Sequence, residues 1–203
     1  MLRLFYAYRG AEVVGGEMEL NGFIGMRESN PERLFVAKRR FSTIFSYGLS
    51  LEEEDRQAGL LADRDFKVIN VLRDGRDVVC LPARGTPCRA DRWIASMQQL
   101  GRHPRLIDYH VRYEELVADP NRVQRSLNEV LGLKRQDHLF DEYPVFVPDE
   151  VFQLPNVKDY PRYGKRPIDR SSVGMDPELY KTQCSRTQAI EFETLLARWG
   201  WIC

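Results

Sequence analysis

The chain has 203 residues, of which 43% are hydrophobic and 30% are charged, a balance typical of a folded globular protein rather than a disordered one. This length suits one domain with a substantial core, or at most two small ones. Basic and acidic residues number 30 each, so the formal net charge is zero. That balance argues against an extended nucleic-acid-binding surface but leaves room for local basic sites.

No apolar run approaches the roughly 20 residues that span a membrane. The N-terminal MLRLFYAYRG lacks the small-residue cleavage site of a signal peptide. We therefore expect a cytoplasmic protein with no membrane span. The cysteines form no CxxC pair and the three histidines are scattered, so we expect free or buried thiols and no zinc site. The four cysteines are Cys80, Cys88, Cys184 and Cys203.

The N-terminal part of the chain predicts four elements. Leu2–Tyr8 has the apolar character of a strand, and Gly10–Gly25, with five glycines, predicts turns and short extended pieces. Leu34–Ala37 is a short apolar run that predicts a buried strand, followed by a basic triplet at 38–40. Ser50–Leu61 begins with a serine cap and has acids in its first turn, which predicts a helix.

The rest of the chain alternates strand and helix patterns. Phe66–Leu72 is apolar and β-branched and predicts a strand, as does the alternation in Arg105–Tyr113. Apolar residues at helical spacing predict helices at Arg89–Leu100, Asn121–Leu131 and Ser185–Trp199. This alternation predicts an α/β fold with a mostly parallel central sheet flanked by helices.

The segment 143–170 contains five prolines and predicts a long, loop-rich connection. Ligands of parallel α/β sheets bind beyond the carboxyl ends of the strands. Polar residues directly after a predicted strand are therefore candidates for a binding site.

Residues 68–82 read VINVLRDGRDVVCLP, in which a predicted strand runs into RDGRD at 73–77. The guanidinium forks of Arg73 and Arg76 suit phosphate or sulfate oxygens. Gly75 permits a tight turn or a close backbone approach. The two aspartates could serve to orient the arginines, or to cap a helix that begins near Val78. From these residues alone, an anion site and a charged helix cap with internal salt bridges remain equal alternatives.

Residues 109–133 read YHVRYEELVADPNRVQRSLNEVLGL, in which an extended segment leads to RYEEL, then ADP, then an amphipathic helix that closes in LGL. Together with VINVLRDGRDV and the C-terminal GMDPELYKTQ and FETLLARWGW, this pattern resembles the PAPS-dependent sulfotransferases. The resemblance runs in order from about Phe35 to the C-terminus. It implies a single domain over residues 1–203 with a P-loop NTPase-like fold. It also implies transfer of a sulfuryl group from 3′-phosphoadenosine 5′-phosphosulfate (PAPS) to a hydroxyl or amine, with release of 3′-phosphoadenosine 5′-phosphate (PAP) and no metal.

The resemblance also implies roles for particular residues. Arg73 matches the arginine that holds the 3′-phosphate of PAPS, Tyr113 matches a tyrosine near the adenine, and Lys38 falls where a basic residue lies near the reacting phosphosulfate. Arg76 and Asp77 match positions that shape the phosphate loop. A late basic loop that returns to the 3′-phosphate corresponds to Lys165, Arg166, Arg170 and Gly174. The general base is a glutamate or histidine in this family, and the candidates are Glu17, Glu19 and Glu28.

The sequence departs from the family pattern at three places. No PKSGTT-like loop precedes the motifs, since YRGAEVVGG at 8–16 has no Ser/Thr pair; Leu81 stands where a phosphate-binding serine is usual; and Met175 replaces an aromatic residue after Gly174. One alternative is therefore a truncated or degenerate module that binds a nucleotide or a partner without catalysis. Another is a kinase of the P-loop superfamily, which the lack of GxxxxGK[ST] disfavours. The acceptor, a small molecule or a carbohydrate, is expected to meet variable loops such as 143–170.

Overall fold

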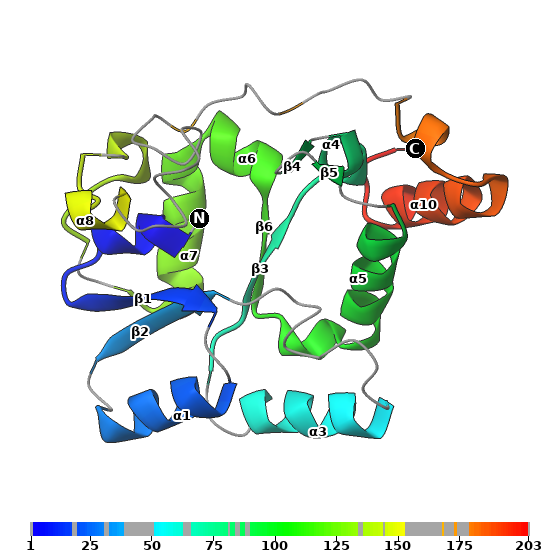
Figure 1. Cartoon of the computed structure of the whole chain (residues 1–203). Coiled ribbons are helices and arrows are strands. Elements are labelled where there is room, and N and C mark those ends of the chain that lie inside the picture. The colour runs from blue at the N-terminus through cyan, green and yellow to red at the C-terminus, as the bar shows by residue number, and fades with distance from the viewer. Residues whose placement is uncertain are drawn as a thin grey trace. The chain divides into compact units, whose positions relative to one another are not determined.

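The computed structural model has an α/β fold (Figure 1). It describes residues 2–17, 20–30, 33–38, 51–62, 66–80, 82–83, 86–87, 90–133, 136–143, 145–152, 168, 173 and 179–202. The chain groups into two compact units. Unit 1 comprises residues 1–40 and 119–168, and unit 2 comprises residues 41–118 and 169–203.

The first element of unit 1 is a 3₁₀ helix, η1 (Leu2–Ala7), where the sequence predicted a strand. That prediction was wrong because the segment does not bury alternate residues. Leu4 and Phe5 are consecutive and both buried, a pattern that a strand with one exposed face does not give. A turn places both against the core, and the N–H of Tyr8 donates to the carbonyl of Phe5 at 3.1 Å, the spacing of a 3₁₀ turn.

The glycine-rich stretch, where turns and short extended pieces were predicted, contains a strand and a helix. The prediction of an extended piece is confirmed, whereas the helix was not predicted. Strand β1 (Ala11–Glu17) pairs in parallel with β2 (Leu34–Lys38), and helix α1 (Leu20–Ser29) connects them in sequence. The pairing is irregular between Val13 and Glu17, where two glycines permit a local departure from regular strand geometry. The backbone hydrogen bonds of a paired strand thus outweigh the weak strand preference of glycine. The predicted strand at 34–37 is confirmed.

Helix α7 (Pro120–Leu131) confirms the strongest helical pattern in the sequence. Asp119 caps it by accepting a hydrogen bond from the N–H of Arg122, and Gly132 ends it with φ of 63°, the left-handed conformation that glycine adopts readily. The 3₁₀ helix η3 (Phe140–Glu142) follows, with Phe140 fully buried. Helix α8 (Asp149–Phe152) is a short exception within the predicted loop-rich segment.

Unit 2 alternates helices and strands along the chain. The predicted helices near 50–61, 89–100 and 185–199 and the predicted strand near 66–72 are confirmed. The predicted strand at 105–113 was half wrong, since a 3₁₀ helix precedes a shorter strand and an unpredicted helix follows it. The elements are α3 (Leu51–Ala62), β3 (Ile69–Leu72), α4 (Gly75–Cys80), β4 (Pro82–Ala83), β5 (Thr86–Pro87), α5 (Ala90–Arg102), η2 (Pro104–Leu106), β6 (Tyr109–Arg112), α6 (Tyr113–Ala118), η5 (Leu179–Gln183) and α10 (Arg186–Arg198).

Strands β3 and β6 form a parallel pair with Ile69 opposite Tyr109 and Leu72 opposite Arg112 (Figure 1). The short strands β4 and β5 pair in antiparallel fashion. Parallel pairing is thus present, but in place of one central sheet the described residues show three sheets of two strands each. Because β3 and β6 are parallel and in register, their carboxyl ends lie at the same edge.

The core of unit 2 lies mainly among α4, α5, η5 and α10. Its rings pack closely: the Trp93 and Phe192 rings are tilted with centroids 4.6 Å apart, and the Phe192 and Tyr180 rings are stacked with centroids 4.8 Å apart. Such aromatic contacts add to the stabilisation from burial itself. The buried cluster consists of Leu72, Val79, Ala90, Trp93, Ile94, Met97, Leu100, Tyr180, Phe192, Leu195 and Leu196.

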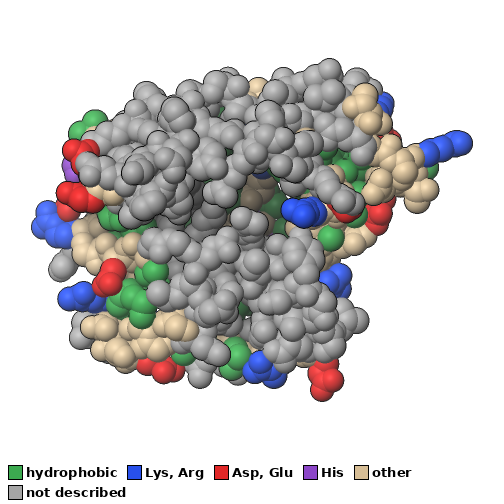
Figure 2. Space-filling model, in the orientation of Figure 1, with side chains coloured by type: hydrophobic (Ala, Val, Ile, Leu, Met, Phe, Trp, Pro, Cys, Tyr) green, Lys and Arg blue, Asp and Glu red, His purple; other side chains and the backbone are tan. Residues whose placement is uncertain are grey.

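The described surface mixes both signs of charge. On the face shown in Figure 2, the described basic and acidic side chains are interspersed, as expected for equal numbers of the two. Among the described residues, every helix is too short or too polar to span a bilayer.

Candidate functional site

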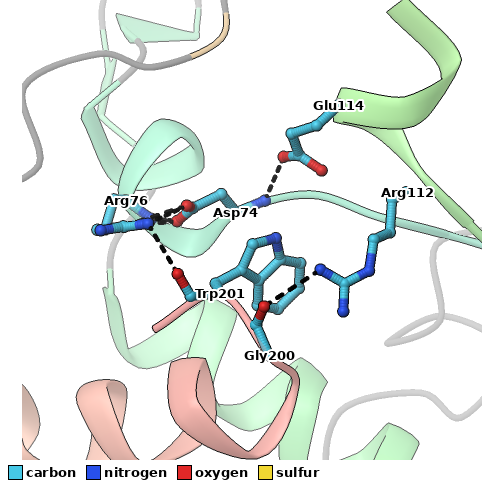
Figure 3. Close-up of polar contacts among 6 residues, drawn as sticks. All are labelled: Asp74, Arg76, Arg112, Glu114, Gly200 and Trp201. Carbon is cyan, nitrogen blue, oxygen red and sulfur yellow. Dashed lines mark hydrogen bonds and ion pairs between the residues drawn. The ribbon is translucent and has the colours of Figure 1, made fainter. Parts of the chain in front are cut away.

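The candidate site lies where β3 and β6 end. The guanidinium carbon of Arg73 lies 4.6 Å from the centroid of the Tyr113 ring, within the range of a cation–π contact. One residue further along the chain from each of these two, the backbone N–H of Asp74 donates to Oε1 of Glu114 at 2.8 Å (Figure 3). Two consecutive residues of RDGRD therefore contact two consecutive residues of RYEEL.

Arg76 is engaged by other groups of the protein. Its Nη2 lies 2.6 Å from Oδ2 of Asp74 and its Nε lies 3.0 Å from Oδ1, a bidentate pair. Nη2 also donates to the carbonyl of Trp201 at 3.4 Å (Figure 3). The hydrogen bonds with Asp74 raise the pKa of Arg76 above its ordinary value. These contacts match the helix-cap alternative for this arginine.

Helix α4 begins at Gly75 rather than near Val78, so Asp74 is its capping residue. Oδ1 of Asp74 accepts from the N–H of Arg76 at 2.9 Å, and the carbonyl of Asp74 accepts from the N–H of Val78 at 3.1 Å. Asp77 lies inside the helix and is buried. Its negative charge contributes to the raised pKa of Arg76, so Asp77 interacts with the arginine electrostatically and is not the helix cap.

Gly75 is needed for packing. A Cβ at this position would lie 2.6 Å from Cε2 of Trp93 and 2.7 Å from Cζ of Phe192, both closer than carbon atoms approach. Of the two roles that the sequence suggested, the close approach is the one observed, and it is directed at the aromatic core.

The C-terminal segment contacts the same edge through Arg112. This arginine donates to the carbonyls of Trp199 and Gly200, and its guanidinium lies 5.3 Å from the ring of Trp201 (Figure 3). These carbonyls directly follow α10, and a cation there is favourable because the carboxyl end of a helix carries partial negative charge. Sequence reasoning did not single out Arg112; its place at the end of a predicted strand was the available signal.

Several buried polar atoms at this edge lack a partner among the residues that the structure describes: Oε2 of Glu114 and the indole nitrogens of Trp199 and Trp201. Glu114 was also missed by sequence reasoning, although it directly follows Tyr113. A buried acceptor without a donor is costly, so its presence beside a hydrogen-bonded turn indicates that the carboxylate has a role there.

No known protein family, curated protein or solved structure matches the chain.

The structure brings four predicted site residues to one region of unit 2: Arg73, Arg76, Asp77 and Tyr113. Lys38 ends β2 in unit 1. Of the candidate bases, Glu17 ends β1 and Glu28 lies exposed on α1. The predicted late loop residues Lys165, Arg166, Arg170 and Gly174 lie outside the described residues, as do Leu81 and Glu19. Within the described part of the chain, no group of acidic, histidine and cysteine side chains could hold a metal ion.

His110, on β6, gives this region a pH dependence. Its Nδ1 lies 3.3 Å from Nδ2 of Asn70 on β3, and its ring lies edge-on to Trp199 with centroids 5.5 Å apart. Burial lowers its pKa below the ordinary 6.5. Between the lowered pKa and 6.5 the unfolded chain therefore binds more protons than the folded one, and stability decreases as the pH is lowered.

We expect the free energy of unfolding to fall as the pH drops from about 7 through 6.5 toward the lowered pKa of His110. In His110→Gln this part of the loss should disappear, because the side chain no longer titrates. Urea unfolding at pH 5, 6 and 7 measures it. Equal pH dependence in wild type and variant would contradict the assignment.

Proposed function

We propose that the chain is a PAPS-dependent sulfotransferase with a P-loop-like α/β fold, which binds its nucleotide at the carboxyl ends of β3 and β6. One observation carries this proposal: Arg73 lies on the ring of Tyr113 at the edge where the two parallel strands end. The two motifs that resemble the family are thereby neighbours in space, although 40 residues separate Asp74 from Glu114 in sequence.

This pairing suits a nucleotide that carries a phosphate beside a base. A guanidinium held over an aromatic ring loses little freedom when it binds, and its remaining fork donates to phosphate oxygens. Arg73 is therefore the ligand for the 3′-phosphate, and Tyr113 adjoins the adenine. Arg76, which is paired with Asp74, holds the turn. Arg170 and Gly174 are proposed to complete the 3′-phosphate site.

The proposed reaction is an in-line displacement. An acceptor hydroxyl or amine attacks the sulfur of PAPS, the bond from sulfur to the phosphate oxygen breaks, PAP leaves, and the acceptor proton passes to a general base. Charge stabilisation around the transferring group supplies most of the acceleration in such reactions.

The test compares two ligands that differ by one phosphate. Isothermal titration calorimetry should show PAP binding more tightly than adenosine 5′-monophosphate, and saturating PAP should raise the melting temperature, because a ligand of the folded state stabilises it. Incubation with radiolabelled PAPS and a panel of acceptors then tests transfer.

Binding of PAP without transfer to any acceptor would favour a nucleotide-binding module. Equal or absent binding of PAP and adenosine 5′-monophosphate would reject the proposed site. Displacement of PAP by ATP with Mg²⁺ would favour a kinase.

A further inference from the structure

The carboxylate of Glu114 holds the backbone of the RDGRD turn. Its Oε1 accepts the N–H of Asp74 at 2.8 Å, and its Oε2 is buried without a partner among the described residues. Figure 3 shows the side chain reaching from the start of α6 to the backbone of the turn. A carboxylate makes a strong acceptor for a backbone N–H, so this bond ties the turn to the start of α6, directly after β6.

The bond fixes the backbone on the C-terminal side of Arg73. On its N-terminal side, Leu72 is buried and is held opposite Arg112 in the β3–β6 ladder. On its C-terminal side, the amide of Asp74 is held by Glu114. Arg73 therefore leaves the backbone between two fixed residues, and its side chain rests on Tyr113.

Asp74 extends the effect to the rest of the turn. Its carboxylate caps α4 and pairs with Arg76, so loss of the amide contact would let the capping residue and the start of the helix shift together. Preorganisation of this kind improves binding because less freedom remains to be lost when the ligand arrives.

We propose that Glu114 is a positioning residue, which holds Arg73 in place for an anionic ligand through the N–H of Asp74. This inference rests on the proposed nucleotide site. The hydrogen-bond acceptor does the positioning, whereas the negative charge opposes a phosphate nearby. A glutamine keeps an acceptor and removes the charge, so the two variants Glu114→Ala and Glu114→Gln separate these effects.

Two measurements test the proposal. Amide hydrogen exchange followed by NMR should show a protected Asp74 amide in wild type and Glu114→Gln and loss of that protection in Glu114→Ala. Titration calorimetry at 25 °C should show PAP binding about tenfold weaker in Glu114→Ala and no weaker than wild type in Glu114→Gln. Glu52→Ala, an exposed glutamate on α3, is the matched control and should bind as wild type does.

The outcomes distinguish this inference from the function on which it rests. Failure of the wild-type chain to bind PAP would reject the nucleotide site itself. Wild-type affinity for PAP in Glu114→Ala, or an unprotected Asp74 amide in the wild-type chain, would overturn the positioning role while leaving the site standing. Equal weakening in the alanine and glutamine variants would also overturn it, because glutamine retains the acceptor.

Discussion

Gly75→Ala is expected to lower the free energy of unfolding by about 1–3 kcal/mol, the usual result of adding a carbon to a packed core. The added Cβ would lie 2.6 Å from Trp93 and 2.7 Å from Phe192. Those rings are buried and lie against each other at a tilted angle, so neither is a flexible end that moves aside at little cost. Urea unfolding of the two chains measures the difference.

The chain offers a matched control in Gly59, which lies within helix α3 with nothing within 4 Å of an added Cβ. Gly59→Ala should leave stability unchanged or raise it, since alanine favours a helix by about 1 kcal/mol over glycine. The double variant Gly75→Ala with Phe192→Leu should lose less than the sum of its single changes, because the smaller side chain relieves the clash. A Gly75→Ala chain as stable as wild type would show that the rings yield freely.

Local patterns predicted the elements in which several independent signals agreed. In α7, the apolar spacing and the flanking ADP and LGL all indicated the same helix, and the structure has the helix with Asp119 as its cap and Gly132 at its end. The N-terminal stretch gave weaker signals. Leu2–Tyr8 was apolar without a clear period, and it forms a 3₁₀ helix. Gly10–Gly25 contains five glycines, and there the pairing of β1 with β2 produces a strand.

The candidate site was predictable to the extent that strand order fixes it. Parallel strands that end at one edge bring Arg73 and Tyr113 together. Arg73 directly followed one predicted strand, and Tyr113 was the last residue of the other. The contacts that organise the turn are of another kind. Asp74 and Glu114 lie 40 residues apart, and Arg76 and Trp201 lie 125 apart. No local periodicity encodes such pairs, which depend on how the elements pack.

The four charges of RDGRD consequently have different roles. Asp74 and Arg76 satisfy each other and the start of α4, while Asp77 is buried in that helix. Arg73 is the member that lies toward β6, on an aromatic ring. The helix-cap alternative thus describes Asp74 and Arg76, whereas Arg73 is the residue proposed for the anion site.

Arg73→Ala should therefore mainly weaken nucleotide binding, whereas Arg76→Ala should mainly lower stability. Arg73→Ala should weaken PAP binding by about 10- to 100-fold, the loss of a charged hydrogen bond, and should abolish the preference for PAP over adenosine 5′-monophosphate. Its melting temperature should change little. Arg76→Ala removes the guanidinium that pairs with the mostly buried carboxylate of Asp74 and should lower the free energy of unfolding by about 1–3 kcal/mol.

Calorimetry with both nucleotides and urea unfolding of the same preparations measure the two effects. Arg105→Ala is the control, because Arg105 is an exposed arginine that precedes β6 and so lies at the opposite edge from Arg73. It should match wild type in both assays. If Arg76→Ala lost PAP binding with its stability intact, Arg76 and not Arg73 would be the phosphate ligand. The Asp74–Arg76 pair would then be a resting arrangement that the nucleotide displaces.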